Sequence, residues 1–274
     1  MFAFAGDFSV RKTNPPVPLA ETPFKLYGGY MIVVDGRIAN LDHQNLLLDT
    51  GTNPSMIDKS VCVKLGLLGA PRDLTLFNQT LVSENAIVPE VQFGPTRRQN
   101  LQVMVADFSK IGKSLGIRID AVIGLDVLGG TNFTVDYVKQ QISFRASPQR
   151  HTVSFSSGPQ FIGVNIRSGR RQLHLLLDTG TPQLVLFENH LRNADYVLSE
   201  RMGTGNNISG EVPFNAVILL QASIGTQKVG PQKASVVTSH QEITNDFDGL
   251  FGISCLRPKR ISFDFEKQVL GWSD

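Results

Sequence analysis

Short apolar runs, separated by turns rich in glycine and proline, recur along the whole chain. The apolar and aromatic run over 24–34 predicts a first strand, and Asp35-Gly36 directly after it is typical of a hairpin turn. The next run ends in Leu46-Leu47-Leu48, as expected of a strand buried on both faces. Over 101–105 apolar residues alternate with other residues, which indicates a half-buried strand. The pattern predicts many short strands.

Two short helices are predicted between these strands. Residues 53–55 read Asn-Pro-Ser and offer capping chemistry for a helix over 56–65. Apolar side chains repeat at every fourth position there, and Gly66 stands where a C-terminal cap is expected. A second short helix is predicted over 186–192.

One seven-residue stretch occurs twice. Residues 46–52 and residues 175–181 both read Leu-Leu-Leu-Asp-Thr-Gly-Thr, so that Asp49 and Asp178 are 129 positions apart (178 − 49). Seven identical residues at this distance indicate two related halves, each of which supplies one acidic group.

The sequence after each copy supports a duplication. Gly124 follows the first Asp by 75 residues (124 − 49), and Gly252 follows the second by 74 (252 − 178). Asp136-Tyr137 and Asp264-Phe265 match at an offset of 128 (264 − 136). About one inserted residue therefore separates the halves, which chance does not explain.

The predicted organisation is an extended lead-in followed by two lobes. Four prolines among polar residues over 1–23 predict the lead-in. The first lobe is placed at 24–147 and the second at 148–274, because the polar stretch between them contains Pro148 and a Ser-Ser-Gly sequence. A chain of 274 residues is long enough for two separate cores.

Composition narrows the class of protein. Charged residues make up 18% of the chain, and its 25 glycines and 14 prolines favour short strands over long helices. The net charge is +2 with the basic residues scattered, so no nucleic acid partner is expected. No apolar run reaches the length of a membrane span. Cys62 and Cys255 lie far apart outside any CxxC spacing, which favours buried free thiols; a disulfide between the halves is the alternative.

The compartment is open on the sequence alone. Ala-Phe-Ala at 3–5 resembles the end of a trimmed secretion signal, which favours a periplasmic or secreted protein. An ordinary disordered N-terminus fits these residues equally well, and residues 1–23 are also compatible with a removable pro-segment.

The paired motifs resemble the aspartic protease superfamily. Each Asp-Thr-Gly follows an apolar strand and is followed some 75 residues later by two apolar residues and a glycine, Val122-Ile123-Gly124 or Leu250-Phe251-Gly252. The short lobes resemble the retropepsin-like branch, and Ile-Gly-x-Asp-x-Leu resembles its bacterial domains. This resemblance implies an all-β, mostly antiparallel fold with few short helices, in which two lobes related by a pseudo-twofold axis close on a central cleft.

The resemblance also implies the chemistry. Asp49 and Asp178 would form a dyad that activates water to hydrolyse peptide bonds, so the chain is expected to be an aspartic endopeptidase. Two adjacent carboxyl groups cannot both ionise easily, so the pair shares one proton, and which residue carries it is open. The dyad is expected to work in acid.

The neighbours of the dyad have implied supporting roles. Thr50 and Thr179 would hydrogen-bond reciprocally across the lobe interface, while Gly51 and Gly180 permit tight turns beside the carboxylates. The hydroxyls of Thr52 and Thr181 would donate to the outer carboxylate oxygens. Gly124 and Gly252 would let a neighbouring strand pass close to each loop. Simple turn chemistry is the alternative for these residues.

Retropepsin-like enzymes cover their cleft with hairpin flaps, and each half has a segment at the right distance. Asn78, Gln79 and Thr80 lie 29–31 residues after Asp49 (78 − 49 to 80 − 49), within two β-rich runs over 73–93. Gly203, Thr204 and Gly205 open a glycine-rich stretch over 203–210, expected to be a hairpin tip, that begins 25 residues after Asp178 (203 − 178). Both lobes are thus expected to supply a flap.

Other acidic residues and other mechanisms are less well supported. Asp120, Asp248, Asp136 and Asp264 occupy equivalent positions and are expected to be structural, and Asp126 has no acidic counterpart. The histidines show no metal-ligand spacing and no GxSxG elbow exists, so neither a metal nor a cofactor is expected.

Three hypotheses on the function remain. The first is a monomeric endopeptidase that acts on an extended polypeptide with both aspartates from one chain. The second is an obligate dimer in which each lobe pairs with the same lobe of another chain, giving two separate dyads. The third is a peptide-binding module of the same fold that does not cleave.

Overall fold

The computed structural model describes residues 21–67, 69–75, 80–158, 160–191, 196–207, 210–238 and 246–274. Strands dominate this part of the chain and the helices are short, as the sequence predicts. No helix among the described residues is long and apolar enough to cross a membrane.

The first half contains ten strands and three short helices among its described residues. In chain order these are β1 (Thr22–Tyr27), β2 (Met31–Ile38), β3 (Leu41–Leu48), β4 (Met56–Asp58), α1 (Lys59–Lys64), β5 (Ala70–Thr75), β6 (Thr80–Phe93), β7 (Thr96–Ala106), α2 (Ser109–Leu115), β8 (Ala121–Ile123), α3 (Leu125–Leu128), β9 (Phe133–Asp136) and β10 (Gln141–Ser143).

The second half repeats much of this order with 3-10 turns in place of α-helices. Its described elements are β11 (His151–Ser154), β12 (Ser156–Ser157), β13 (Ile162–Ser168), β14 (Arg171–Asp178), β15 (Leu184–Phe187), η1 (Glu188–His190), β16 (Tyr196–Asn207), β17 (Gly210–Leu219), β18 (Ala222–Ile224), β19 (Gln227–Lys228), β20 (Gln232–Val237), β21 (Gly249–Gly252), η2 (Ile253–Leu256), β22 (Arg260–Asp264) and β23 (Val269–Ser273).

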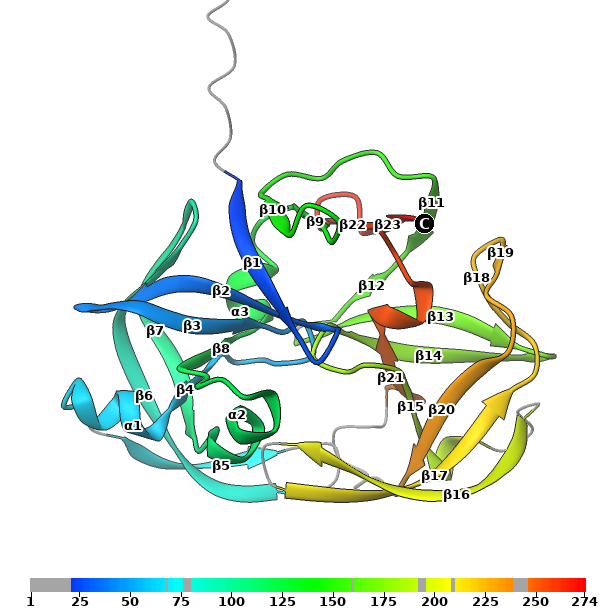
Figure 1. Ribbon diagram of the computed structural model, residues 1–274, viewed down its shortest axis with the longest axis horizontal. Helices are drawn as coiled ribbons and strands as arrows, with labels where there is room; N and C mark the ends of the chain where they lie inside the picture. The colour runs from blue at the N-terminus through cyan, green and yellow to red at the C-terminus, as the bar shows by residue number, and fades with distance from the viewer. Residues whose placement is uncertain are drawn as a thin grey trace, which may run out of the picture.

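Two hydrogen-bonded sheets contain these strands. The larger runs in the order β11-β23-β22-β9-β10-β1-β2-β3-β8-β4-β7-β6-β5, and the smaller in the order β16-β17-β20-β15-β21-β14-β13-β18-β19, with β12 beside β13. Figure 1 shows two arms that carry the hairpins β5–β6 and β16–β17 at the lower edge, with the strands β9, β10, β22 and β23 above the space between them.

The two halves use the same pairing next to the repeated motif. In the first half β3 runs parallel to β8, with Leu46 opposite Ala121. In the second half β14 runs parallel to β21, with Leu175 opposite Gly249. These positions are equivalent at the offsets read from the sequence (175 − 46 = 129, 249 − 121 = 128).

The halves meet in the antiparallel pair β9–β22. Thr134 lies opposite Ser262, and these residues are themselves equivalent at an offset of 128 (262 − 134). Their hydroxyl oxygens are 3.1 Å apart. A pair of equivalent residues that face each other marks a local twofold axis, so the pseudo-twofold relation passes between Thr134 and Ser262. The proposed lobe boundary at 148 falls between β10 and β11 and stays a prediction.

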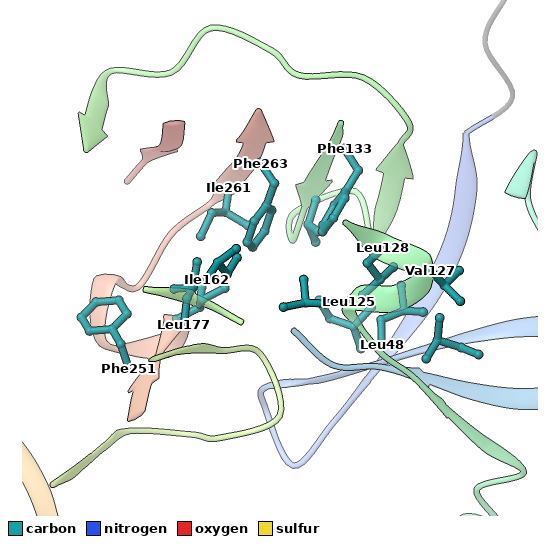
Figure 2. Packing of buried hydrophobic residues seen from close by; sticks show 14 of the residues in the cluster. Leu48, Leu125, Val127, Leu128, Phe133, Ile162, Leu177, Phe251, Ile261 and Phe263 are labelled. Carbon is teal, nitrogen blue, oxygen red and sulfur yellow. The ribbon is translucent and has the colours of Figure 1, made fainter. Parts of the chain in front are cut away.

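One continuous core fills the space below β9 and β22. Phe133 and Phe263 stack with ring centroids 4.5 Å apart and planes 24° from parallel. Figure 2 shows these rings next to each other, above Leu48 and Leu177, which immediately precede the repeated Asp-Thr-Gly stretches. Stacked rings at this distance add to the free energy of apolar burial. The motif loops therefore stand on a core shared by both halves.

The first predicted strand is wrong in its boundaries. It is divided into β1 and β2 by a turn in which Gly28 and Gly29 both have positive φ. Asp35-Gly36 is not a hairpin turn but lies within β2. A Cβ on Gly36 would stand 2.7 Å from the carbonyl oxygen of Gln92, so the glycine allows β6 to pass close to β2.

The predicted helices are shorter than expected. Residues 56–58 form strand β4, and α1 begins only after Asp58, whose carboxylate accepts a hydrogen bond from the Ser60 backbone N–H. The predicted cap at 53–55 is therefore wrong. In the second half β15 pairs with β20 through residue 187, which leaves only η1 of the helix predicted over 186–192. Cys62 and Cys255 are free, which agrees with the favoured prediction.

Candidate active site

The two repeated aspartates stand at the ends of equivalent strands. Asp49 directly follows β3, and its backbone N–H donates to the carbonyl oxygen of Ile123 at 2.9 Å. Asp178 ends β14, where it lies opposite Gly252 in the parallel pair with β21. Both side chains are partly exposed, and their carboxyl groups are hydrogen-bonded to each other. The fold thus brings together carboxyl groups that are 129 residues apart (178 − 49) in sequence.

The two motif loops are locked together by their threonines. The backbone N–H of Thr50 donates to Oγ1 of Thr179 at 3.0 Å, and the N–H of Thr179 donates to Oγ1 of Thr50 at 3.1 Å. Each hydroxyl in turn donates across the interface, Thr50 to the carbonyl of Leu177 at 2.8 Å and Thr179 to that of Leu48 at 3.1 Å. Both threonines are buried, so these bonds satisfy groups that water does not reach.

The glycines bring each loop against the opposite carboxyl group. A Cβ on Gly51 would stand 2.5 Å from Cγ of Asp178, and one on Gly180 would stand 2.7 Å from Oδ2 of Asp49. Real side chains do not tolerate such contacts. Only glycine at both positions allows this approach of the two loops.

Donors from its own motif loop hold each carboxyl group. The N–H of Gly51 donates to Oδ1 of Asp49 at 2.8 Å, and the N–H of Gly180 donates to Oδ1 of Asp178 at 2.7 Å. The hydroxyl of Thr52 donates to Oδ2 of Asp49 at 2.7 Å, as predicted from the resemblance. The prediction for Thr181 is wrong in its donor: its backbone N–H serves Asp178, and among the described residues no bond from its hydroxyl reaches that carboxylate.

The environment favours one shared proton. Burial raises the pKa of Asp178 well above its usual value, and the charge and hydrogen bond of Asp49 raise it further. The N–H groups of Gly180 and Thr181 act in the opposite direction and are outweighed. A carboxyl group with a raised pKa beside a second carboxyl group is the arrangement in which one acid stays protonated while its partner can ionise.

The two predicted loop-packing glycines sit behind the motif loops. A Cβ on Gly124 would stand 2.3 Å from the carbonyl oxygen of Thr52, and a Cβ on Gly252 would stand 2.6 Å from that of Thr181. A side chain at either position would push the loop away from its strand.

The predicted flap residues lie on two long hairpins. Asn78 and Gln79 are outside the described residues, while Thr80 pairs with Thr75 at the start of β6. Gly203, Thr204 and Gly205 lie within β16, opposite residues 212–214 of β17. The strands stay paired as far as Asn207 and Gly210, so the hairpin turns within the predicted stretch 203–210 but beyond these three residues. The glycine at 203 is explained by packing, because a Cβ there would stand 2.5 Å from the Phe214 ring.

A tyrosine that no sequence pattern indicates also lies near the dyad. Tyr30, in the turn between β1 and β2, lies within electrostatic range of both aspartates. Burial raises the pKa of its phenol, and the charges of Asp178 and Asp49 add to this. Figure 1 shows the β1–β2 turn near the centre of the molecule, between the two arms. Tyr30 has no counterpart in the repeat, so the duplication could not point to it.

The other acidic residues have structural partners. Asp120 accepts from the Asn45 backbone N–H at 2.8 Å, and Asp248 accepts from the equivalent N–H of His174 at 2.9 Å. Asp126, which the repeat does not duplicate, binds Ser55 beside the first motif loop. No group of three or more potential metal ligands occurs in the part of the chain that the structure describes.

Part of the sequence is similar to a known protein family, and the fold is similar to that of solved structures. Residues 34–127 match the family model described as aspartyl protease. The aspartic proteinase from Irpex lacteus, one of 304 matching chains of solved structures, superposes with a TM-score of 0.53 at 13% identity. The alignment covers 92% of this chain and 96% of that chain. Residues 34–127 are therefore similar to aspartyl proteases in sequence, and most of the chain shares the fold of an aspartic proteinase.

The fold of an aspartic proteinase thus extends over both halves, which confirms the predicted mostly β, acid-protease-like fold. The family match covers the first Asp-Thr-Gly and Gly124, whereas the second half is matched through its fold. A search of curated proteins finds no match to the sequence.

Proposed function

We propose that this protein is an aspartic endopeptidase in which Asp49 and Asp178 of one chain activate water. The observation that carries the proposal is the reciprocal lock between Thr50 and Thr179, which holds the two carboxyl groups face to face within one chain. The raised pKa of Asp178 supports the shared proton that this chemistry needs.

The reaction needs one ionised and one protonated carboxyl group. The ionised group accepts a proton from water as the water oxygen attacks the substrate carbonyl carbon, and the protonated group donates to the carbonyl oxygen. The product of this step is a tetrahedral gem-diol. When it collapses, the bond from carbon to nitrogen breaks, the protonated carboxyl group gives its proton to the leaving amine, and the ionised carboxyl group takes the proton of a gem-diol hydroxyl, so that the dyad again holds one shared proton.

An extended polypeptide is the proposed substrate. The hairpins β5–β6 and β16–β17 both project from the lobes at the distance from the motif where flaps are expected. Two hairpins of this kind support the retropepsin-like branch.

A monomeric dyad is proposed over two dyads in an obligate dimer. The equivalent strands β9 and β22 already pair within the chain, and Phe133 stacks on Phe263 across the same interface. The surfaces that a partner lobe would occupy are therefore filled by the chain's own second half. Sedimentation of the active protein tests this, because a monomeric active species excludes the dimer scheme.

A peptide-binding module without cleavage is the second candidate function. Both aspartates and their donors are present, which favours the enzyme. Incubation with a peptide library across about pH 3 to 8 separates the candidates, because this range spans the titration of an acidic dyad. We expect cleavage that a statine-type inhibitor blocks. Peptide binding without any cleavage in this range would instead support the module.

A further inference from the structure

The carboxylate of Asp126 accepts two hydrogen bonds from Ser55, beside the first motif loop. Its Oδ2 accepts from the Ser55 backbone N–H at 2.9 Å, and its Oδ1 accepts from the Ser55 hydroxyl at 2.6 Å. Ser55 is fully buried, and its Oγ also accepts from the Gly124 backbone N–H at 2.9 Å. Every polar group of Ser55 is thereby used, since its carbonyl accepts from Met104 N–H at 3.0 Å.

These bonds fix the segment that continues from Asp49. At the start of the segment, the carbonyl of Thr52 accepts from the Leu125 backbone N–H at 2.9 Å. At its end, Ser55 is held by Asp126. Thr52, between Asp49 and this clamp, donates its hydroxyl to Oδ2 of Asp49 at 2.7 Å. The Asp126 clamp is thus joined to the Asp49 carboxylate through Ser55, the backbone of residues 53 and 54, and the Thr52 hydroxyl.

The described residues of the second lobe contain no carboxylate clamp of this kind, and the backbone N–H of Leu184 bonds the Cys255 thiol instead. The position equivalent to Ser55 is Leu184 (55 + 129), which is fully buried, and the position equivalent to Asp126 is Ser254 (126 + 128). Leu184 cannot donate from its side chain and Ser254 carries no charge. Thr181 correspondingly serves Asp178 through its backbone N–H and not through its hydroxyl. The two halves of the site are therefore chemically unequal.

We propose that Asp126 is a positioning residue that, through Ser55 and Thr52, holds Asp49 as the ionised member of the pair and leaves the shared proton on Asp178. The catalytic role of Asp126 rests on the proposed function, whereas its contacts with Ser55 do not. The Thr52 hydroxyl donates to Oδ2 of Asp49, and such a donor favours the charged form of a carboxyl group, so a fixed Thr52 favours the shared proton on Asp178.

Two other titratable groups lie near Asp49. Asp178 on β14 carries the opposing carboxyl group, and Tyr30 in the β1–β2 turn carries a neutral phenol whose pKa is raised. Neither is in contact with Asp126, which binds Ser55 alone among the described residues. Loss of the Asp126 clamp should therefore raise the pKa of the pair through the Thr52 segment, whereas loss of the Asp126 negative charge by itself would lower it.

Carboxyl titration followed by NMR with ¹³C-labelled aspartate tests the proposal without any substrate. The Asp49 signal is assigned by its absence in Asp49→Asn. In Asp126→Ala we expect the lower apparent pKa of the pair to rise by about one unit, the size of one lost hydrogen bond to a charged group. Asp126→Asn keeps one acceptor for Ser55 and should shift it less; this variant also serves if Asp126→Ala does not fold. Ser254→Ala is the matched control and should leave the titration unchanged.

A double substitution tests whether Asp126 acts on Asp49 through Thr52. Thr52→Val should raise the same pKa, and adding Asp126→Ala to Thr52→Val should give no further rise, because the clamp acts through the Thr52 hydroxyl that Thr52→Val has already removed. An unchanged pKa in the folded Asp126 variants, or fully additive shifts, would overturn the proposal. A protein that cleaves no peptide but shows the expected shifts would refute the endopeptidase function and leave the positioning role intact.

Discussion

Gly51 of the first motif loop packs directly against the carboxyl group of Asp178 in the second. A Cβ at position 51 would stand 2.5 Å from Cγ of Asp178, and the relation is reciprocal, since a Cβ on Gly180 would stand 2.7 Å from Oδ2 of Asp49. Each lobe therefore sets the position of the other lobe's acid. The catalytic geometry depends on the interface as much as on either motif.

Gly51→Ala should disrupt this geometry with little effect on the fold. The added methyl group must displace Asp178 or its loop, and a displacement of about 1 Å in an active site costs roughly 100-fold in rate. Peptide-cleavage kinetics with circular dichroism as a folding control measure this. Gly66→Ala is a suitable comparison, because no atom lies within 4 Å of a Cβ there, although its positive φ adds some strain. Equal rates for Gly51→Ala and the wild type would contradict the packing account.

Thr50→Val should lower the free energy of unfolding. The change leaves the carbonyl of Leu177 and the N–H of Thr179 without their partner, and a buried polar group left unsatisfied costs about 1–3 kcal/mol. Urea denaturation measures the loss. Thr50→Ser keeps the hydroxyl and should retain most of the stability. If Thr50→Val and Thr179→Val were fully additive, the two threonines would not act as one lock.

The sequence predicts the central part of the site because the duplication repeats it. Asp49 and Asp178, with their threonines and glycines, could all be found by comparing the two copies. Features present in one lobe only could not be found in this way, and these include Tyr30, Ser55 and the contact of Asp126. The different donors of Thr52 and Thr181 were also hidden, because identical residues sit in copies whose surroundings differ.

Element boundaries were less predictable because they depend on tertiary contacts. Gly36 looks like a turn residue in sequence, but it serves the close passage of β6 over β2. Ser55 looks like a helix cap, yet its hydroxyl binds Asp126 and the helix begins after Asp58. In both cases a contact with a residue far along the chain prevails over the local signal.

Asp178→Asn should stabilise the protein at neutral pH. The folded pKa of Asp178 is raised above its unfolded value, so its contribution to stability is complete below the unfolded pKa and is lost as pH rises through the folded pKa. An uncharged amide avoids this loss. Thermal unfolding should show a higher midpoint for Asp178→Asn at neutral pH and a difference that vanishes in acid. A difference that grew in acid would contradict the raised pKa.

The Asp136–Arg260 pair should stabilise the contact between the halves. Arg260 Nε donates to Oδ2 of Asp136 at 2.7 Å across the β9–β22 pair. Although burial alone raises the pKa of Asp136, the N–H groups of Lys139 and Val138 and the Arg260 side chain bring it below its usual value. A lowered pKa contributes stability that is present above the unfolded pKa and is lost as pH falls through the folded pKa.

Asp136→Asn should therefore cost about 1–2 kcal/mol near neutral pH, less than a buried pair because Arg260 is 48% exposed. Urea denaturation at neutral pH and in acid measures the cost. Asp264→Asn, at the equivalent position, is the comparison; its carboxylate bonds only within its own turn and to Lys267 among the described residues. A cost for Asp136→Asn that persists unchanged in acid would exclude the ionised pair as its source.

The central claim is that one chain supplies both acids of a single dyad. The most direct measurement is the rate of peptide cleavage by Asp49→Asn and by Asp178→Asn at a concentration where the wild type sediments as a monomer. Either substitution alone should abolish cleavage, because the remaining acid has no partner within the chain. If either variant kept about half of the wild-type rate, as expected for a dimer with one of its two separate dyads intact, the single-chain dyad would be wrong.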